Sequence, residues 1–174
     1  MTSGPVGAPQ PFRLREDARE WFKALYEKDF RIGFDAFYFC FMAGVATGNK
    51  VQTPNSAAPE LVPYFPDRYA PRKQLLVALF LTQELEDLGI QMGEKKDVHA
   101  KIKKLLEPNS SGHHLSEEGV KEFNKYAHGG FEVLRDEWFD DRPRSLETFL
   151  RIFKQELDEA IAKRKLADVL ASKP

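Results

Sequence analysis

The sequence is poor in cysteine, in long apolar runs and in excess charge of either sign, and each absence excludes a class of protein. The single cysteine, Cys40, cannot form an internal disulfide, which argues against a disulfide-stabilised secreted fold and favours a reducing compartment. The most apolar stretch, residues 34–46, is shorter than the ~20 residues that a membrane-spanning helix needs. We therefore expect a cytoplasmic protein without a membrane partner.

Charge and length narrow the possibilities further. Lys and Arg number 26 and Asp and Glu number 27, so the net charge of -1 offers no broad attraction to a phosphate backbone. The 174 residues and 12% aromatic content suit one folded domain. Residues 1–13 lack the charged and apolar regions of a secretory signal, so we expect a flexible tail there and a single helical domain over residues 14–174.

Apolar residues recur every three or four positions through most of the chain, which is the spacing of amphipathic helices. The run over residues 34–46 is apolar on every face; a strand is the alternative there, but its length and its alanines favour a buried helix. The pattern predicts an all-α bundle of about six helices, with the 34–46 and 74–88 helices as its core pair. The predicted helices cover residues 15–28, 34–46, 74–88, 94–106, 116–138 and 145–170.

A long proline-rich loop is predicted over residues 47–71, because repeated prolines remove the backbone donors that a helix or central strand needs. These prolines are Pro54, Pro59, Pro63 and Pro66. The loop contains the aromatic residues Tyr64, Phe65 and Tyr69. These side chains either pin the loop to the body of the protein or form a partner-binding surface.

The segment from Tyr126 to Phe131 contains two adjacent glycines, Gly129 and Gly130, inside a predicted helix. Each glycine there costs about 1 kcal/mol relative to alanine, so a compensating interaction is expected. One interpretation is close packing against the 34–46 helix, which contains Gly44. The other is a binding cleft formed by Tyr126, His128, Gly129 and Gly130.

Sequence patterns for catalysis or metal binding are weak. The histidines and Cys40 lack the paired short spacings of zinc sites, and the chain contains no nucleophile elbow, zinc-protease motif or phosphate-binding loop. Four carboxylates near the end of a predicted helix form an acidic group that could hold Mg²⁺. Nearby arginines make local ion pairing the simpler interpretation. We therefore expect no cofactor and no metal. The acidic group consists of Asp136, Glu137, Asp140 and Asp141.

Basic residues concentrate in three stretches that could follow a phosphate backbone if they converge; the alternative is a solvated helix face. One stretch is Lys163, Arg164 and Lys165 near the end of the sequence. Lysines load the 94–106 helix, and further basic residues open the 74–88 helix. The candidate nucleic-acid-binding residues are Arg68, Arg72, Lys73, Lys101, Lys103 and Lys104.

The phrase EFNKYAHGGFEVL, together with the apolar run FYFCFMAGVATG, resembles small helical accessory proteins of bacterial DNA-phosphorothioation and phage-defence systems. In the small DNA-binding member of that group, a similar phrase matches Glu122 to Tyr126 here. This chain is longer and nearly neutral, so nicked-DNA binding and tetramer formation do not carry over from the resemblance.

Three functions follow in order of preference. The first is a non-enzymatic accessory subunit that binds a protein partner through the proline-rich loop and the Tyr126–Phe131 region. The second is a nucleic-acid-binding accessory protein that uses the lysine-rich helix. The third is a metal-dependent hydrolase or nuclease that uses the acidic group. The pattern does not specify the oligomeric state.

Overall fold

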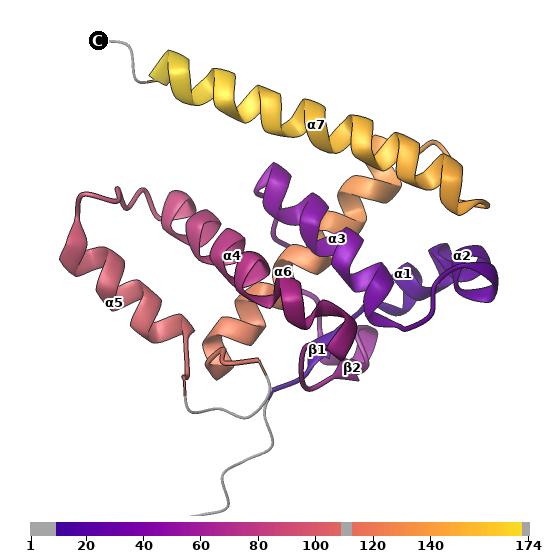
Figure 1. Cartoon of the computed structure of the whole chain (residues 1–174), viewed down its shortest axis with the longest axis horizontal. Helices are drawn as coiled ribbons and strands as arrows, with labels where there is room; N and C mark the ends of the chain where they lie inside the picture. Colours follow the sequence, from indigo (N-terminus) through magenta and orange to yellow (C-terminus); the bar gives the residue numbers. More distant parts are fainter. Residues whose placement is uncertain (1–9, 109–112, 172–174) are drawn as a thin grey trace, which may run out of the picture. The chain divides into compact units, whose positions relative to one another are not determined.

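A computed structural model describes residues 10–108 and 113–171, and it is mostly helical (Figure 1). Seven α-helices lie in the described residues, so the all-helical prediction is confirmed. The prediction of a tail over residues 1–13 falls largely outside the described residues. Its last part is wrong, because Phe12 is fully buried and lies in a short strand.

The chain divides into two compact units, which we describe separately. Unit 1 comprises the residues up to Arg13 and Glu60–Phe123, and unit 2 comprises Leu14–Pro59 and the residues from Asn124 onward. The prediction of a single domain stays a prediction. The helices expected to form one core pair belong to different units, so each is described with the neighbours in its own unit.

Unit 1 begins with a two-stranded antiparallel sheet, in which β1 (Phe12–Arg13) pairs with β2 (Glu60–Val62). A 3-10 helix, η2 (Asp67–Arg72), leads into α4 (Lys73–Asp87), and Gly89, with a φ of 68°, follows the end of α4. The helix α5 (Lys95–Leu105) packs against α4, and the first part of α6 (Glu117–Val133) completes the unit.

The core of unit 1 is a cluster of aromatic rings. The ring of Phe12 lies 4.9 Å from that of Phe65 and 5.4 Å from that of Phe123, between ring centroids, and Phe80 is 5.1 Å from Phe123. The part of the predicted proline-rich loop that belongs to unit 1 is therefore packed into this core through Phe65. The other short elements of the loop are η1 (Asn55–Ala57), which belongs to unit 2, and the β2 and η2 segments.

Unit 2 is built around α3 (Phe34–Thr47), which has nine buried residues and is the buried helix expected from its apolar run. It ends at Gly48, whose φ of 70° is accessible mainly to glycine. The 26-residue helix α7 (Leu146–Ala171) packs along α3 (Figure 1), and Phe149 and Phe153 each lie 5.0 Å from Phe39.

Unit 2 also contains two short helices near its start and the second part of α6. The predicted 15–28 helix is interrupted at Phe22, which gives α1 (Glu16–Trp21) and α2 (Lys23–Lys28). Residues of α6 from Asn124 continue into a π-helical turn, η3 (Leu134–Trp138), so the predicted helix does run through both glycines.

Candidate functional site

The two adjacent glycines of α6, Gly129 and Gly130, serve close packing inside unit 2. A Cβ atom on Gly130 would overlap the carbonyl oxygen of Cys40 and lie 2.6 Å from the Gly44 nitrogen, whereas real Cβ atoms stay at least 3.0 Å from such neighbours. A Cβ on Gly44 would likewise overlap the Tyr126 carbonyl. The backbones of α3 and α6 are therefore in direct contact, as the packing interpretation predicts.

The same packing removes this region as a partner-binding surface. Tyr126 has no exposed surface, His128 is 3% exposed, and Gly129 and Gly130 are buried. The carbonyl oxygen of Gly129 accepts a hydrogen bond of 3.0 Å from the Asn49 side chain. These residues pack against other segments of unit 2, so the protein itself fills the cleft expected at Tyr126, His128, Gly129 and Gly130. The interpretation of this region as a binding cleft is therefore wrong.

The aromatic residues of the proline-rich loop are mostly buried as well. Phe65 and Tyr69 are each 7% exposed, and only Tyr64, at 52%, presents its side chain to solvent. The loop is therefore held down by Phe65 and Tyr69, and the predicted binding surface there reduces to Tyr64.

The predicted nucleic-acid-binding residues all lie in unit 1. The three of them on α5, Lys101, Lys103 and Lys104, do not share one face of that helix. Lys101 points toward α4, where its ammonium nitrogen is 3.9 Å from the nearly buried carboxylate of Glu84. Lys103 and Lys104 are exposed, and so are Arg68 and Arg72 near the start of α4. Lys73 is half-buried.

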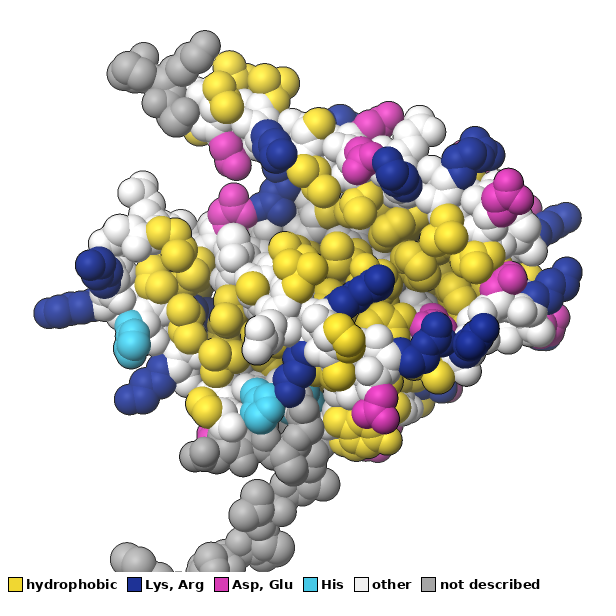
Figure 2. Space-filling view, viewed as in Figure 1, with side chains coloured by type: hydrophobic (Ala, Val, Ile, Leu, Met, Phe, Trp, Pro, Cys, Tyr) yellow, Lys and Arg dark blue, Asp and Glu magenta, His cyan; other side chains and the backbone are white. Residues whose placement is uncertain are grey.

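A different set of α5 residues forms a continuous basic stripe. Lys95 and Lys96 are one helical turn from His99, and Lys103 is one turn further on, so these four side chains share one face. All four are exposed, while Asp97 lies on the side of Lys101. Figure 2 shows Lys, Arg and His side chains projecting at the edge where α5 lies.

Two of the four carboxylates of the acidic group, those of Asp136 and Asp141, form local ion pairs. Asp136 accepts hydrogen bonds of 2.7 and 3.0 Å from the Arg135 guanidinium, which lowers the pKa of the Asp136 carboxyl. Asp141 lies 3.5 Å from Arg144. Within residues 10–108 and 113–171, no three His, Cys, Asp or Glu side chains come close enough to hold a metal ion.

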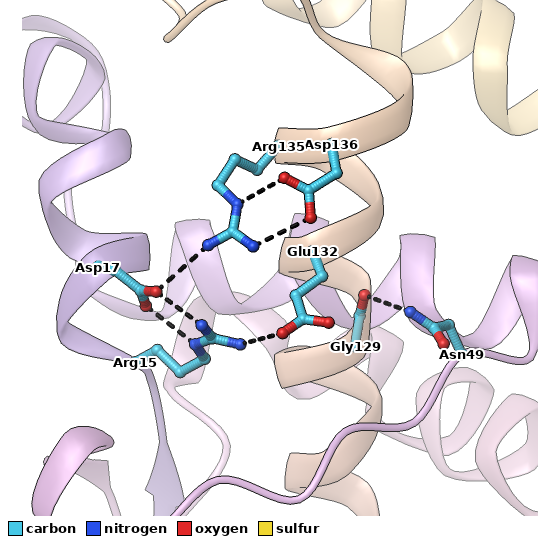
Figure 3. A network of polar contacts seen from close by, with 7 residues as sticks. All are labelled: Arg15, Asp17, Asn49, Gly129, Glu132, Arg135 and Asp136. Atoms are coloured by element: carbon cyan, nitrogen blue, oxygen red, sulfur yellow. Dashed lines mark hydrogen bonds and ion pairs between the residues drawn. The ribbon is translucent and has the colours of Figure 1, made fainter.

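Sequence reasoning missed a polar network that joins the start of α1 to α6 (Figure 3). The Arg15 guanidinium donates to both carboxylate oxygens of Asp17 and, at 2.8 Å, to Glu132. Burial lowers the pKa of Arg15, but the bonds to both carboxylates outweigh it and the pKa is raised. Arg135 reaches Asp17 at 3.4 Å, so one carboxylate bridges two arginines.

The two arginines of this network also cover one aromatic ring. The guanidinium carbons of Arg15 and Arg135 lie 5.3 and 5.2 Å from the ring centroid of Phe131, which is fully buried. Residues separated by more than a hundred positions meet here, and no periodic pattern in the sequence relates them.

Two open pockets of about 410 and 420 Å³ adjoin Glu132 from unit 2. The first has mainly polar walls, whereas the second also has apolar walls at Val51, Pro54 and Ala57. The first is lined by Thr47, Asn49, Val133, Asp136 and Glu137, and the second by Glu16, Asp17, Gln52, Thr53 and Pro54. We attribute a structural role to the network between them.

Three large apolar side chains of unit 2 are exposed at the end of α7. Leu166, Val169 and Leu170 are 61%, 53% and 61% exposed, although each is a large hydrophobic side chain. Figure 2 shows hydrophobic side chains, with Lys and Arg beside them, at the end of this helix. Such a cluster is a feature of protein interaction surfaces. It was detectable in the sequence, because these residues fall out of step with the apolar stripe of residues 146–161.

No described helix is both long enough and apolar enough to cross a membrane. Comparison of the chain with protein-family models, curated proteins and solved structures found no match. The described residues thus define a mostly helical protein with an exposed apolar helix end and a basic helix face.

Proposed function

We propose that this chain is a non-enzymatic accessory subunit that binds a protein partner in a larger assembly. The observation that carries the proposal is the end of α7, where three large apolar side chains are more than half exposed. Burying a Leu or Val side chain contributes roughly 1.5–3 kcal/mol, so a partner that covers this end of α7 would form a complex stabilised by apolar burial. The binding surface differs from the one that the sequence predicts.

The cell compartment and the assembly belong to the same proposal. Cys40 is buried and has no disulfide partner, which suits a protein of the reducing cytoplasm. The resemblance of the EFNKY phrase to phage-defence accessory proteins makes such a system the first in which to seek the partner.

The test is a pull-down of the full-length tagged protein from its own host, with nuclease treatment, followed by mass spectrometry. The variant carrying Leu166→Asp, Val169→Asp and Leu170→Asp is expected to lose the proteins that the wild type retains. The matched control places Asp at Leu75, Leu88 and Met92, which are 58%, 55% and 71% exposed in unit 1. Equal retention by the α7 variant and the wild type would overturn the proposal.

A second candidate function, nucleic-acid binding, is favoured by the basic stripe of α5. The stripe of Lys95, Lys96, His99 and Lys103 spans about 12 Å along the helix axis, enough to face roughly four phosphates of one strand. Fluorescence anisotropy with a labelled DNA duplex and an RNA hairpin tests it. Lys95→Glu, Lys96→Glu and Lys103→Glu together should weaken binding and reduce its salt dependence, whereas undiminished binding would rule the stripe out.

A further inference from the structure

The end of α7 carries a narrow apolar stripe with the spacing of a helix that docks in a groove. Ala162, Leu166, Val169 and Leu170 are exposed and lie zero, four, seven and eight positions along the helix. This spacing places them on one face, as in amphipathic helices that bind apolar grooves. The stripe is therefore shaped for a concave apolar partner surface.

This face differs from the one that α7 uses inside unit 2. Phe149 and Phe153 are buried, and Leu157, Ala160 and Arg164 continue the same side at steps of three or four with partial burial. Arg164 donates a hydrogen bond of 2.9 Å to the carbonyl oxygen of Val45 near the end of α3. Every residue from Lys165 to Ala171 is exposed, so the buried side of α7 ends at Arg164.

Positive charges border the apolar stripe on both sides. Lys163 lies three positions before Leu166, and Lys165 lies four positions before Val169, on opposite flanks. Both lysines are exposed. Within residues 162–171 the one acidic residue is Asp168, which lies on the side of α7 opposite the apolar stripe, four positions after Arg164. A partner surface that complements the stripe therefore needs an apolar floor and negative edges.

We propose that the end of α7 binds as a helix in an apolar groove of a protein partner whose rim carries Asp and Glu side chains. This inference rests on the proposed function and specifies the chemistry of the partner. A second copy of the chain fits less well, because parallel pairing of the two stripes places Lys163 and Lys165 beside the same lysines of the other copy. A lipid surface fits less well, because stable membrane attachment needs a larger apolar face or a second anchor.

The experiment uses the full-length protein with a photo-crosslinking residue, benzoylphenylalanine, in place of Leu166. Irradiation in a host extract, digestion and mass spectrometry then identify the crosslinked peptide. The expected peptide belongs to another protein and has apolar residues with Asp or Glu in its sequence or beside it in the folded partner. A crosslink to a second copy of this chain, or to an apolar surface without carboxylates, would overturn the inference.

Charge reversal tests the rim directly, with binding measured against the identified partner. Lys163→Glu with Lys165→Glu should weaken binding about tenfold at low salt, by a slower association rate, and the difference should shrink as salt rises. The matched control is Lys23→Glu with Lys28→Glu, which makes the same charge change at exposed residues of α2. Replacing the mapped carboxylates of the partner by lysine should restore binding to the Lys163 and Lys165 variant.

The outcomes separate this inference from the function on which it rests. Loss of binding with the aspartate variants at the stripe, but unchanged binding with the Lys163 and Lys165 variant, leaves the accessory-subunit function intact and overturns the acidic rim. Unchanged binding with both sets, or no retained partner for the wild type, overturns both. Equal weakening by the α2 control shows that only net charge matters and overturns the rim as well.

Discussion

The variant Gly130→Ala is expected to destabilise unit 2 strongly, although alanine is the better helix former. In an open helix this change would stabilise by about 1 kcal/mol. Here the new methyl group overlaps the Cys40 carbonyl oxygen and lies 2.6 Å from the Gly44 nitrogen, both of which belong to the backbone of α3. The clash cannot be relieved by rotating a side chain, so α3 and α6 must separate.

The expected size follows from the opposing effects. Forcing atoms into a packed core costs about 1–3 kcal/mol. Separating the two helices also removes roughly ten to twenty atom contacts around them, which adds about 2 kcal/mol. After the gain in helix propensity is subtracted, we expect a net loss of about 2–4 kcal/mol in the free energy of unfolding. For a protein of this size that loss lowers the melting temperature by roughly 5–15 °C.

Tryptophan fluorescence is the appropriate assay, because both tryptophans of the chain, Trp21 and Trp138, lie in unit 2. Thermal and urea unfolding are followed for the wild type, for Gly130→Ala and for the control Gly93→Ala, where a Cβ meets no atom within 4 Å. The control should unfold like the wild type. A Gly130→Ala protein that melts at the wild-type temperature or above it would refute the close contact between α3 and α6.

Three further predictions concern other contacts. Below the ordinary His pKa of about 6.5, unit 1 should lose stability, because burial lowers the pKa of His113 and its neutral ring accepts a 3.1 Å bond from the Leu115 amide. The readout is the protection factor of that amide, which compares its exchange rate with that of an unfolded chain at the same pH. The protection factor should fall below this pH, and His113→Phe should remove this pH dependence. Arg15→Ala should cost about 1–2 kcal/mol in urea unfolding by removing the pair with Glu132, and a cost equal to that of an exposed arginine would contradict this. Arg164→Ala should lower the free energy of unfolding by about 0.5–1 kcal/mol, because it removes a cation from the last carbonyls of α3. Amide exchange at the end of α7 should become faster, and unchanged exchange would refute the attachment of α7 to α3 through Arg164.

Some features of the fold were predictable because they depend on neighbours in the sequence. The apolar run of residues 34–46 indicated a buried helix, which α3 confirms. Glycine readily adopts the positive φ that ends many helices, and Gly48 and Gly89 both adopt it after α3 and α4. Ser116 and Ser145 begin the predicted helices of residues 116–138 and 145–170, and their hydroxyl oxygens accept hydrogen bonds from the Gly119 and Thr148 amides.

The candidate surfaces were less predictable. The lysines of α5 were recognised as a basic group, but only the packing of α4 against α5 showed that Lys101 faces Glu84 and that His99 lies on the exposed stripe. The loop aromatics were recognised as either pinned or exposed, and their burial decided between these alternatives for Phe65 and Tyr69.

The sequence by itself determined that the chain is helical, where most helices begin and end, and that two glycines in one helix require compensation. Those properties follow from the spacing of apolar residues and from local backbone chemistry. Only the tertiary structure decided that the compensation is contact with the backbone at Cys40 and Gly44, and that Arg15 meets Glu132. Such contacts join segments far apart in the chain, so their geometry depends on how whole helices pack and not on any local pattern.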